Sequence, residues 1–177
     1  MLNRRFVSDF GDELVPLGQL VSILKLSVKD RVLALGDLNG FYSMVFSKYA
    51  QEVHSVLQEK VWYEYVRKLS LKFGRRNIFV YLQDPCTNPL ADSPNAFFLK
   101  VRGFSNECIA NIAKSMSEKK EIEKGLAITA TALPFYSEAD PSPQAISEAF
   151  EKSGFRLLAK VDFKYHSALY FTKQHKI

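Results

Sequence analysis

The sequence predicts an α/β protein: one three-layer α/β/α domain with a seven-stranded, mostly parallel sheet. Three observations lead to this prediction. Short apolar runs alternate with amphipathic segments along most of the chain. Several of these runs are continuously apolar, which is typical of strands buried on both faces. The last two strand patterns follow one another after a few residues, as the strands of a β-hairpin do.

Length and composition agree with a single domain. The chain has 177 residues, 47% of them hydrophobic and 24% charged, which is an ordinary globular mixture. We treat 1–177 as one domain with an N-terminal extension over 1–13. No apolar run approaches the ~18 residues of a membrane span. Arg4 and Arg5 are not followed by the apolar region of a secretory signal, so we expect a cytoplasmic protein.

The first half of the chain contains three helix patterns and three strand patterns. In chain order they are helix 14–26, strand 31–36, helix 41–49, strand 52–57, helix 59–73 and strand 77–82. The helices are predicted from apolar residues at helical spacing, such as Leu17, Leu20, Val21 and Leu24 in the first. Gly74 ends the third helix, since glycine tolerates the φ > 0 of a helix cap.

The second half begins with a turn-rich segment, 84–94, whose three prolines bar regular structure. The expected elements that follow are strand 96–101, helix 106–123, strand 126–131, loop 132–143, helix 144–152 and strands 155–163 and 167–172. The pattern is five β–α units followed by two strands. Crossovers make the strands of β–α units parallel, and the hairpin adds an antiparallel strand.

A glycine-containing loop, Gly36 to Gly40, joins the first strand to its helix. Ligands of open α/β sheets bind outside the carboxyl ends of the strands, so this loop either lines a ligand crevice or is only a tight turn. It has neither the G-x-G-x-x-G spacing of a dinucleotide loop nor the G-K-[ST] of a triphosphate loop.

Several segments resemble one family in the right order. Residues 28–43, VKDRVLALGDLNGFYS, resemble the first motif of class I S-adenosylmethionine (SAM) dependent methyltransferases, V-L-D-L-G-x-G-x-G. Residues 83–93, QDPCTNPLADS, are similar to that family's G-D-A-x-x-L-P-F-x-D-x-S segment, and Gly154 to Leu158 is similar to its closing G-F-x-x-L. The resemblance covers about residues 14–172 and is greatest to the small type-11-like members.

The resemblance implies a Rossmann-like sheet with strand order 3-2-1-4-5-7-6, SAM as cofactor and methyl transfer to an unknown acceptor. The residues it implies for cofactor binding are Gly36, Asp37, Leu38, Asn39, Gly40, Leu57, Gln58, Glu59, Asp84 and Pro85. It implies no particular catalytic residue, because alignment of nucleophile and methyl carbon supplies most of the acceleration. Residues 1–13, 84–94 and 132–143 would form the substrate wall.

Three positions depart from the family pattern. Ala34 stands where the family has an acid, Leu38 replaces its middle glycine, and Leu57 replaces the acid that holds the ribose. Either Gln58 or Glu59 could reach the ribose instead. We expect Leu38 and Leu57 to form an apolar plug that partly fills the cofactor pocket. The alternative function is therefore a non-catalytic methyltransferase-like binding or partner subunit with weak or no SAM binding.

Two alternatives stay open at Asp84, which either faces the adenine or closes an Asx-turn before Pro85. We expect Cys86 and Cys108 to be reduced, because two cysteines without C-x-x-C spacing form neither a disulfide framework nor a zinc site. His166 is predicted to be a surface histidine, with a base near the top of the sheet as the alternative.

The partners are less defined by the sequence. The net charge is +5, and six cations between Glu59 and Arg76 permit nucleic-acid binding through the Lys60–Arg76 basic helix. A solvated helix face is the preferred interpretation of that helix. The scattered histidines predict no metal site. A protein partner or a homo-oligomer is compatible with the alternative function.

Overall fold

The computed structural model describes residues 15–87 and 94–175. The helices and strands in these residues are, in chain order, α2 (Leu17–Leu24), β1 (Arg31–Leu35), α3 (Phe41–Phe46), β2 (Glu52–Leu57), α4 (Lys60–Lys72), β3 (Ile78–Leu82), β4 (Ala96–Val101), α5 (Asn106–Glu118), β5 (Lys124–Ala130), α6 (Pro143–Lys152), β6 (Phe155–Asp162) and β7 (His166–Lys173).

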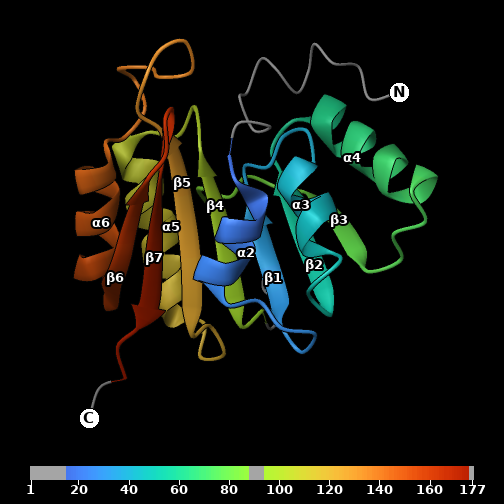
Figure 1. Ribbon diagram of the computed structural model, residues 1–177, viewed down its shortest axis with the longest axis horizontal. Helices are drawn as coiled ribbons and strands as arrows, with labels where there is room; N and C mark the ends of the chain where they lie inside the picture. The colour runs from blue at the N-terminus through green and yellow to red at the C-terminus, as the bar shows by residue number, and fades with distance from the viewer. Residues whose placement is uncertain (1–14, 88–93, 176–177) are drawn as a thin grey trace.

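The strands form one seven-stranded sheet with the order β3-β2-β1-β4-β5-β7-β6 (Figure 1). The five strands from β3 to β5 are mutually parallel. Strand β7 is antiparallel to both of its neighbours, β5 and β6. The predicted fold class, strand order and C-terminal hairpin are therefore confirmed.

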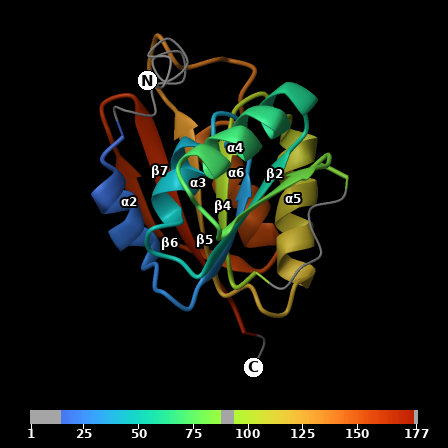
Figure 2. The same cartoon turned by 90° about the vertical axis from the view of Figure 1, so that its right-hand side faces the viewer.

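Helices cover both faces of the sheet (Figure 2). On one face α2 and α3 bury Leu20, Leu24 and Phe46 against the strands, and α4 lies beside α3. On the other face α5 and α6 bury Ile112 and Phe150. This is the three-layer arrangement that repeated crossovers produce, because each crossover helix packs back onto the sheet.

Some boundaries differ from the expectation. Helix α5 ends at Glu118 rather than at 123, because Lys119 has an extended backbone (φ −79°, ψ 112°). Helix α3 ends at Phe46 rather than at 49. The third β–α unit lacks a helix in the described part of its connection, residues 83–87 and 94–95. The prolines of this segment are the physical reason, since they prevent a regular helix.

A buried carboxylate joins the amino ends of the central strands. Asp30 accepts hydrogen bonds from the Lys124 ammonium at 2.8 Å and from the Asn95 side chain at 2.9 Å. Asn95 accepts in turn from the backbone N–H of Arg31 at 2.7 Å. Burial alone raises the pKa of Asp30, but the bonds from Lys124, Ser27 and Asn95 and the charge of Lys124 outweigh it and hold that pKa below its ordinary value.

The two edge strands of the sheet differ in their outward side chains. Strand β6 alternates less exposed and more exposed residues, and its exposed residues include the charged Arg156, Lys160 and Asp162. Strand β3, with the sequence IFVYL, carries no charge. Its Phe79 and Leu82 are 41% and 46% exposed.

Candidate functional site

A cavity of ≈ 260 Å³ lies at the carboxyl ends of the central parallel strands. It is lined by Gly36, Leu38, Val56, Leu57, Gln58, Glu59, Pro85, Arg102, Gly103 and Phe104. These residues follow or end β1, β2, β3 and β4, so the cavity lies where the strand order reverses between β1 and β4. This is the place at which open α/β sheets bind ligands.

The loop after β1 is a turn whose glycines have structural reasons. Gly36 has φ +75°, and a Cβ there would lie 2.5 Å from the Lys100 carbonyl oxygen and 2.8 Å from the Phe104 ring. Gly40 has φ +69° and faces Val66. Both glycines are thus the turn glycines that the sequence predicts, and Gly36 allows the ends of β1 and β4 to pack closely.

Asp37 lies behind the cavity rather than in its wall. Its side chain is fully buried. The carboxylate accepts hydrogen bonds from the backbone N–H of Ser43 at 2.7 Å and of Tyr42 at 3.4 Å. These N–H groups belong to the first turn of α3, where a negative charge also compensates the helix dipole. Asp37 therefore fixes the loop to α3.

Leu38 and Leu57 lie in the same cavity wall. Leu57 ends β2 and is 1% exposed, whereas Leu38 is partly buried. The backbone of Leu38 does not require glycine, because Lys25 is the one non-glycine residue with positive φ among those that the structure describes. The effect of the two leucines on SAM binding stays a prediction.

Gln58 and Glu59 form an exposed polar part of the same wall, directly after β2. Glu59 is the N-cap of α4, but its side chain makes no capping hydrogen bond. Within the part of the chain that the structure describes, no cation pairs with the Glu59 carboxylate. This carboxylate is therefore available as an acceptor at the mouth of the cavity.

Asp84 and Asn39 are used in local turns. The Asp84 carboxylate accepts the backbone N–H of Cys86 at 2.9 Å, which closes an Asx-turn, while the adjacent Pro85 lines the cavity. The Asn39 side chain accepts from the N–H of Phe41 at 3.1 Å and lines a different cavity, between α3 and α4. A role of Asp84 toward adenine stays a prediction.

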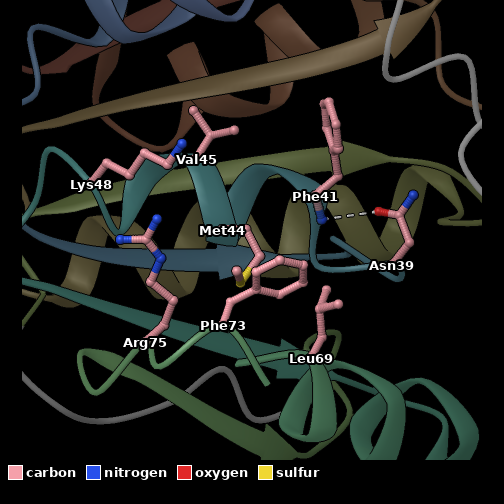
Figure 3. Close-up of a pocket in the computed structure, with 8 residues that line it drawn as sticks. All are labelled: Asn39, Phe41, Met44, Val45, Lys48, Leu69, Phe73 and Arg75. Atoms are coloured by element: carbon pink, nitrogen blue, oxygen red, sulfur yellow. Dashed lines mark hydrogen bonds between the residues drawn. The ribbon is translucent and has the colours of Figure 1, made fainter. Parts of the chain in front are cut away.

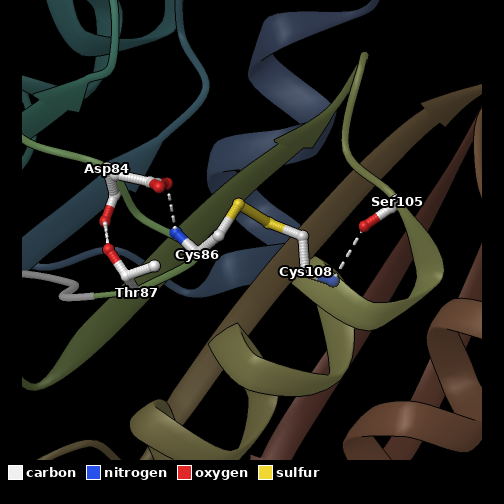
Figure 4. Close-up of a disulfide and its surroundings, with 5 residues drawn as sticks. All are labelled: Asp84, Cys86, Thr87, Ser105 and Cys108. Carbon is white, nitrogen blue, oxygen red and sulfur yellow. Dashed lines mark hydrogen bonds between the residues drawn. A yellow bond between two sulfur atoms is a disulfide. The ribbon is translucent and has the colours of Figure 1, made fainter.

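The expectation of two reduced cysteines is wrong. Cys86 and Cys108 form a disulfide with their Cα atoms 4.8 Å apart (Figure 4). Cys86 lies in the turn after β3, and Cys108 lies in the first turn of α5, where its N–H donates to Ser105 Oγ at 3.1 Å. The topology brings these segments together across β4, and the spacing of 22 residues does not reveal that proximity.

His166 is also placed differently from the expectation. It is 3% exposed and stacks on Phe135 with ring centroids 5.8 Å apart. The reason is that β7 begins at His166, which pairs with Ala130 of β5, so the residue belongs to the sheet and not to the hairpin turn. Its place at the carboxyl end of β5 agrees with the alternative position, near the top of the sheet.

Several residues of this region were missed by the sequence reasoning. Arg102, Gly103 and Phe104 line the cavity from the loop after β4. Lys100 is 7% exposed, and its ammonium lies 5.3 Å from the centre of the Tyr42 ring. A lysine inside the apolar run AFFLKV was the available signal, because lysine is almost never fully buried unless it has a partner.

The cations of the basic helix do not line this cavity. Five of the six cations of this helix are exposed on α4 and the following turn, whereas Arg75 is partly buried. Lys60 pairs with Glu64 at 3.9 Å one helical turn away. This exposure fits a solvated helix face. None of the helices in the described ranges is long and apolar enough to cross a membrane.

Comparison with known proteins identifies the fold. The chain matches no family profile and no curated protein sequence. It is similar to the structure of a SAM-dependent methyltransferase from Aquifex aeolicus, with 18% identity, coverage of 91% of each chain and a TM-score of 0.70. It is also similar to geranyl diphosphate methyltransferase in complex with SAM, with 9% identity, coverage of 89% of this chain and 84% of that one, and a TM-score of 0.73.

A third similar structure belongs to a protein with another activity. The [4+2]-cyclase SpnF shares 10% identity, with coverage of 89% of this chain and 79% of that one and a TM-score of 0.73. The chain therefore has the Rossmann-like fold of class I methyltransferases, as the resemblance implied. The fold alone does not fix the chemistry, because one fold hosts many functions.

Proposed function

We propose that the chain binds SAM in the cavity at the carboxyl ends of β1 and β2 and transfers its methyl group to an acceptor. The observation that carries this proposal is the Glu59 carboxylate, which lines the cavity and pairs with no described cation. It offers the hydroxyl acceptor that Leu57 does not provide, two residues further along the chain.

The residues present fit this cofactor in part. Vicinal ribose hydroxyls need a carboxylate acceptor, which Glu59 supplies, and Gln58 adds an amide next to it. Pro85 and Phe104 line the cavity and supply apolar contacts for a flat heterocycle. We assign Asp84 the adenine amino group through the carboxylate oxygen that does not close the Asx-turn.

When bound, SAM supplies an activated methyl group on a sulfonium, so the protein's task is alignment rather than bond polarisation. Gly36 and Asp37 hold the loop against β4 and α3, which fixes the cavity wall. A general base is required only for an acceptor that is protonated at the working pH. We keep a cytoplasmic location as part of the proposal, with cell fractionation as its test.

Titration calorimetry with SAM and with S-adenosylhomocysteine tests the proposal. We expect saturable binding of both at micromolar concentration. Absence of heat at millimolar ligand with folded protein contradicts it and favours a partner subunit.

A pair of variants locates the site. Glu59→Gln should weaken binding of S-adenosylhomocysteine by about ten-fold or more, the cost of one charge-assisted hydrogen bond. Glu64→Gln removes another carboxylate of the same helix, outside the cavity, and should leave binding unchanged. Equal affinities of the two variants contradict the role of Glu59.

The alternative is a methyltransferase-like subunit that binds a partner and does not turn over. Leu38 and Leu57 favour it, because they make the wall apolar where the resembled family is polar or open. In that case co-purification or a shift in size-exclusion chromatography identifies a protein partner or a second copy of the chain. Nucleic acid is the lesser candidate partner, through the exposed cations of α4.

A further inference from the structure

A second cavity, of ≈ 210 Å³, lies between α3 and α4, on the sheet face that these helices cover (Figure 3). Its lining residues are Asn39, Phe41, Met44, Val45, Lys48, Leu69, Phe73 and Arg75. The proposed methyl transfer makes no use of this cavity, so the inference below goes beyond that function.

The walls of this cavity are apolar. Met44 and Val45 contribute from α3, and Leu69 contributes from α4. Phe73, directly after α4, is 49% exposed although its ring lines the cavity. Contact between water and such an apolar surface is unfavourable, and protein interiors normally fill gaps of this size with packed side chains. An open apolar recess with a few polar groups has the character of a small-molecule site.

The polar groups are cations gathered at one end. Figure 3 shows Lys48 and Arg75 at the same end of the cavity and Asn39 at the opposite end. No acidic residue is among the lining residues. In residues 15–87 and 94–175, no carboxylate forms an ion pair with Lys48 or Arg75. The Nε atom of Arg75 is itself buried and makes no hydrogen bond with those residues.

These features define the chemistry of the ligand. A planar guanidinium with a buried, unbonded N–H matches the two oxygens of a carboxylate. The oxygen of Asn39 at the other end already accepts the N–H of Phe41 at 3.1 Å. The anionic end of a ligand is therefore directed toward Arg75 and Lys48, and its hydrocarbon part toward Met44 and Leu69.

We propose that the cavity between α3 and α4 binds a small organic carboxylate with a compact aryl or acyl body. Its volume is below the ~300–1,000 Å³ of drug-sized sites, which favours a ligand with one ring or a short branched chain. The carboxylate pairs with Arg75 and Lys48, while the body fills the apolar recess. The two cavities share no lining residue, so a ligand here does not occupy the proposed SAM site.

Nuclear magnetic resonance with 3-phenylpropionate tests this proposal on the full chain. We expect saturable shifts of the methyl signals of Met44, Val45 and Leu69. The amide 3-phenylpropionamide has the body without the charge, and acetate has the charge without the body. Both should bind at least about ten-fold more weakly. Absence of binding by the acid, or equal binding of acid and amide, overturns the proposal.

Variants separate this site from general charge effects. Arg75→Gln should weaken 3-phenylpropionate by about ten-fold, whereas Arg76→Gln, at an exposed neighbouring cation outside the cavity, should not. If Arg75→Gln does not fold, the exposed Lys48→Gln provides the same comparison. Equal affinity of a folded cavity variant and Arg76→Gln overturns the proposal. S-adenosylhomocysteine binding, measured in parallel, reports on the other cavity alone.

Discussion

The disulfide between Cys86 and Cys108 ties the turn that carries Pro85 to the first turn of α5. Pro85 lines the candidate cofactor cavity, so the covalent bond lies one residue from the cavity wall. In the described residues the turn is also held by the Asp84 bonds to Cys86 and Thr87, and Gln83 before it donates to the Leu57 carbonyl at 2.9 Å. We therefore expect the position of this wall to depend on the oxidation state of the two sulfurs.

Reduction of the disulfide should lower the stability of the chain. The bond joins residues 22 positions apart. Its removal increases the conformational entropy of the unfolded chain and so lowers the free energy of unfolding by about 3 kcal/mol. Urea unfolding with and without dithiothreitol measures this. A Cys86→Ser, Cys108→Ser double variant should match the reduced protein and be indifferent to dithiothreitol. An unchanged urea midpoint on reduction contradicts this prediction.

Removal of the two leucines from the cofactor cavity should create or strengthen SAM binding. Leu38→Gly takes away a side chain of the wall, and Leu57→Asp restores a ribose acceptor at the end of β2. Calorimetry on the double variant, with wild type as reference, measures the gain. If wild type already binds SAM tightly and Leu38→Gly weakens it, the leucines are part of the binding surface and the plug hypothesis is wrong.

The Asp30–Lys124 ion pair should make stability depend on pH in acid. The folded-state pKa of Asp30 is below its ordinary value. The ion pair therefore stabilises the folded protein at every pH above the ordinary pKa. This stabilisation is lost below about pH 4, as pH falls through the folded-state pKa. Asp30→Asn should thus have a lower free energy of unfolding than wild type at pH 7, and the difference between the two proteins should become smaller as the pH falls.

The control for the acid dependence is Glu151→Gln, at an exposed position of α6. Urea midpoints measured from pH 7 to pH 3 should show no such narrowing for this variant. A constant difference between Asp30→Asn and wild type at every pH would show that the destabilisation comes from packing alone.

Two glycines with positive φ should respond differently to alanine. Gly74 has φ +63° and open space around it, so Gly74→Ala should cost only the backbone penalty of about 1–2 kcal/mol. Gly36→Ala should cost about 1–3 kcal/mol more, because its Cβ would collide with the Lys100 carbonyl and Phe104. Chemical denaturation of both variants measures the difference. Equal losses of stability would show that the Lys100 carbonyl and Phe104 move away from the new Cβ without an energetic penalty.

The sequence predicted the sheet well because parallel strands buried on both faces have a recognisable apolar pattern. The location of the cavity followed from the same pattern, since the switch point is a property of the topology. The disulfide did not follow, because it depends on how the turn after β3 lies against α5. The burial of His166 depends on a hairpin turn that lies one residue earlier than the sequence predicts, at residues 163–165 instead of 164–166. The cation pair at Lys48 and Arg75 depends on the packing of two helices, which periodicity does not encode.

The unequal edges of the sheet have a consequence for the chain at high concentration. The outer side of an edge strand offers unpaired backbone groups to any extended segment, and natural proteins discourage such pairing with charged side chains. Strand β6 has this protection, whereas β3 presents only apolar and aromatic residues. We expect the β3 strands of two copies to pair edge to edge, so that the two sheets form one continuous sheet and aggregation begins at this edge.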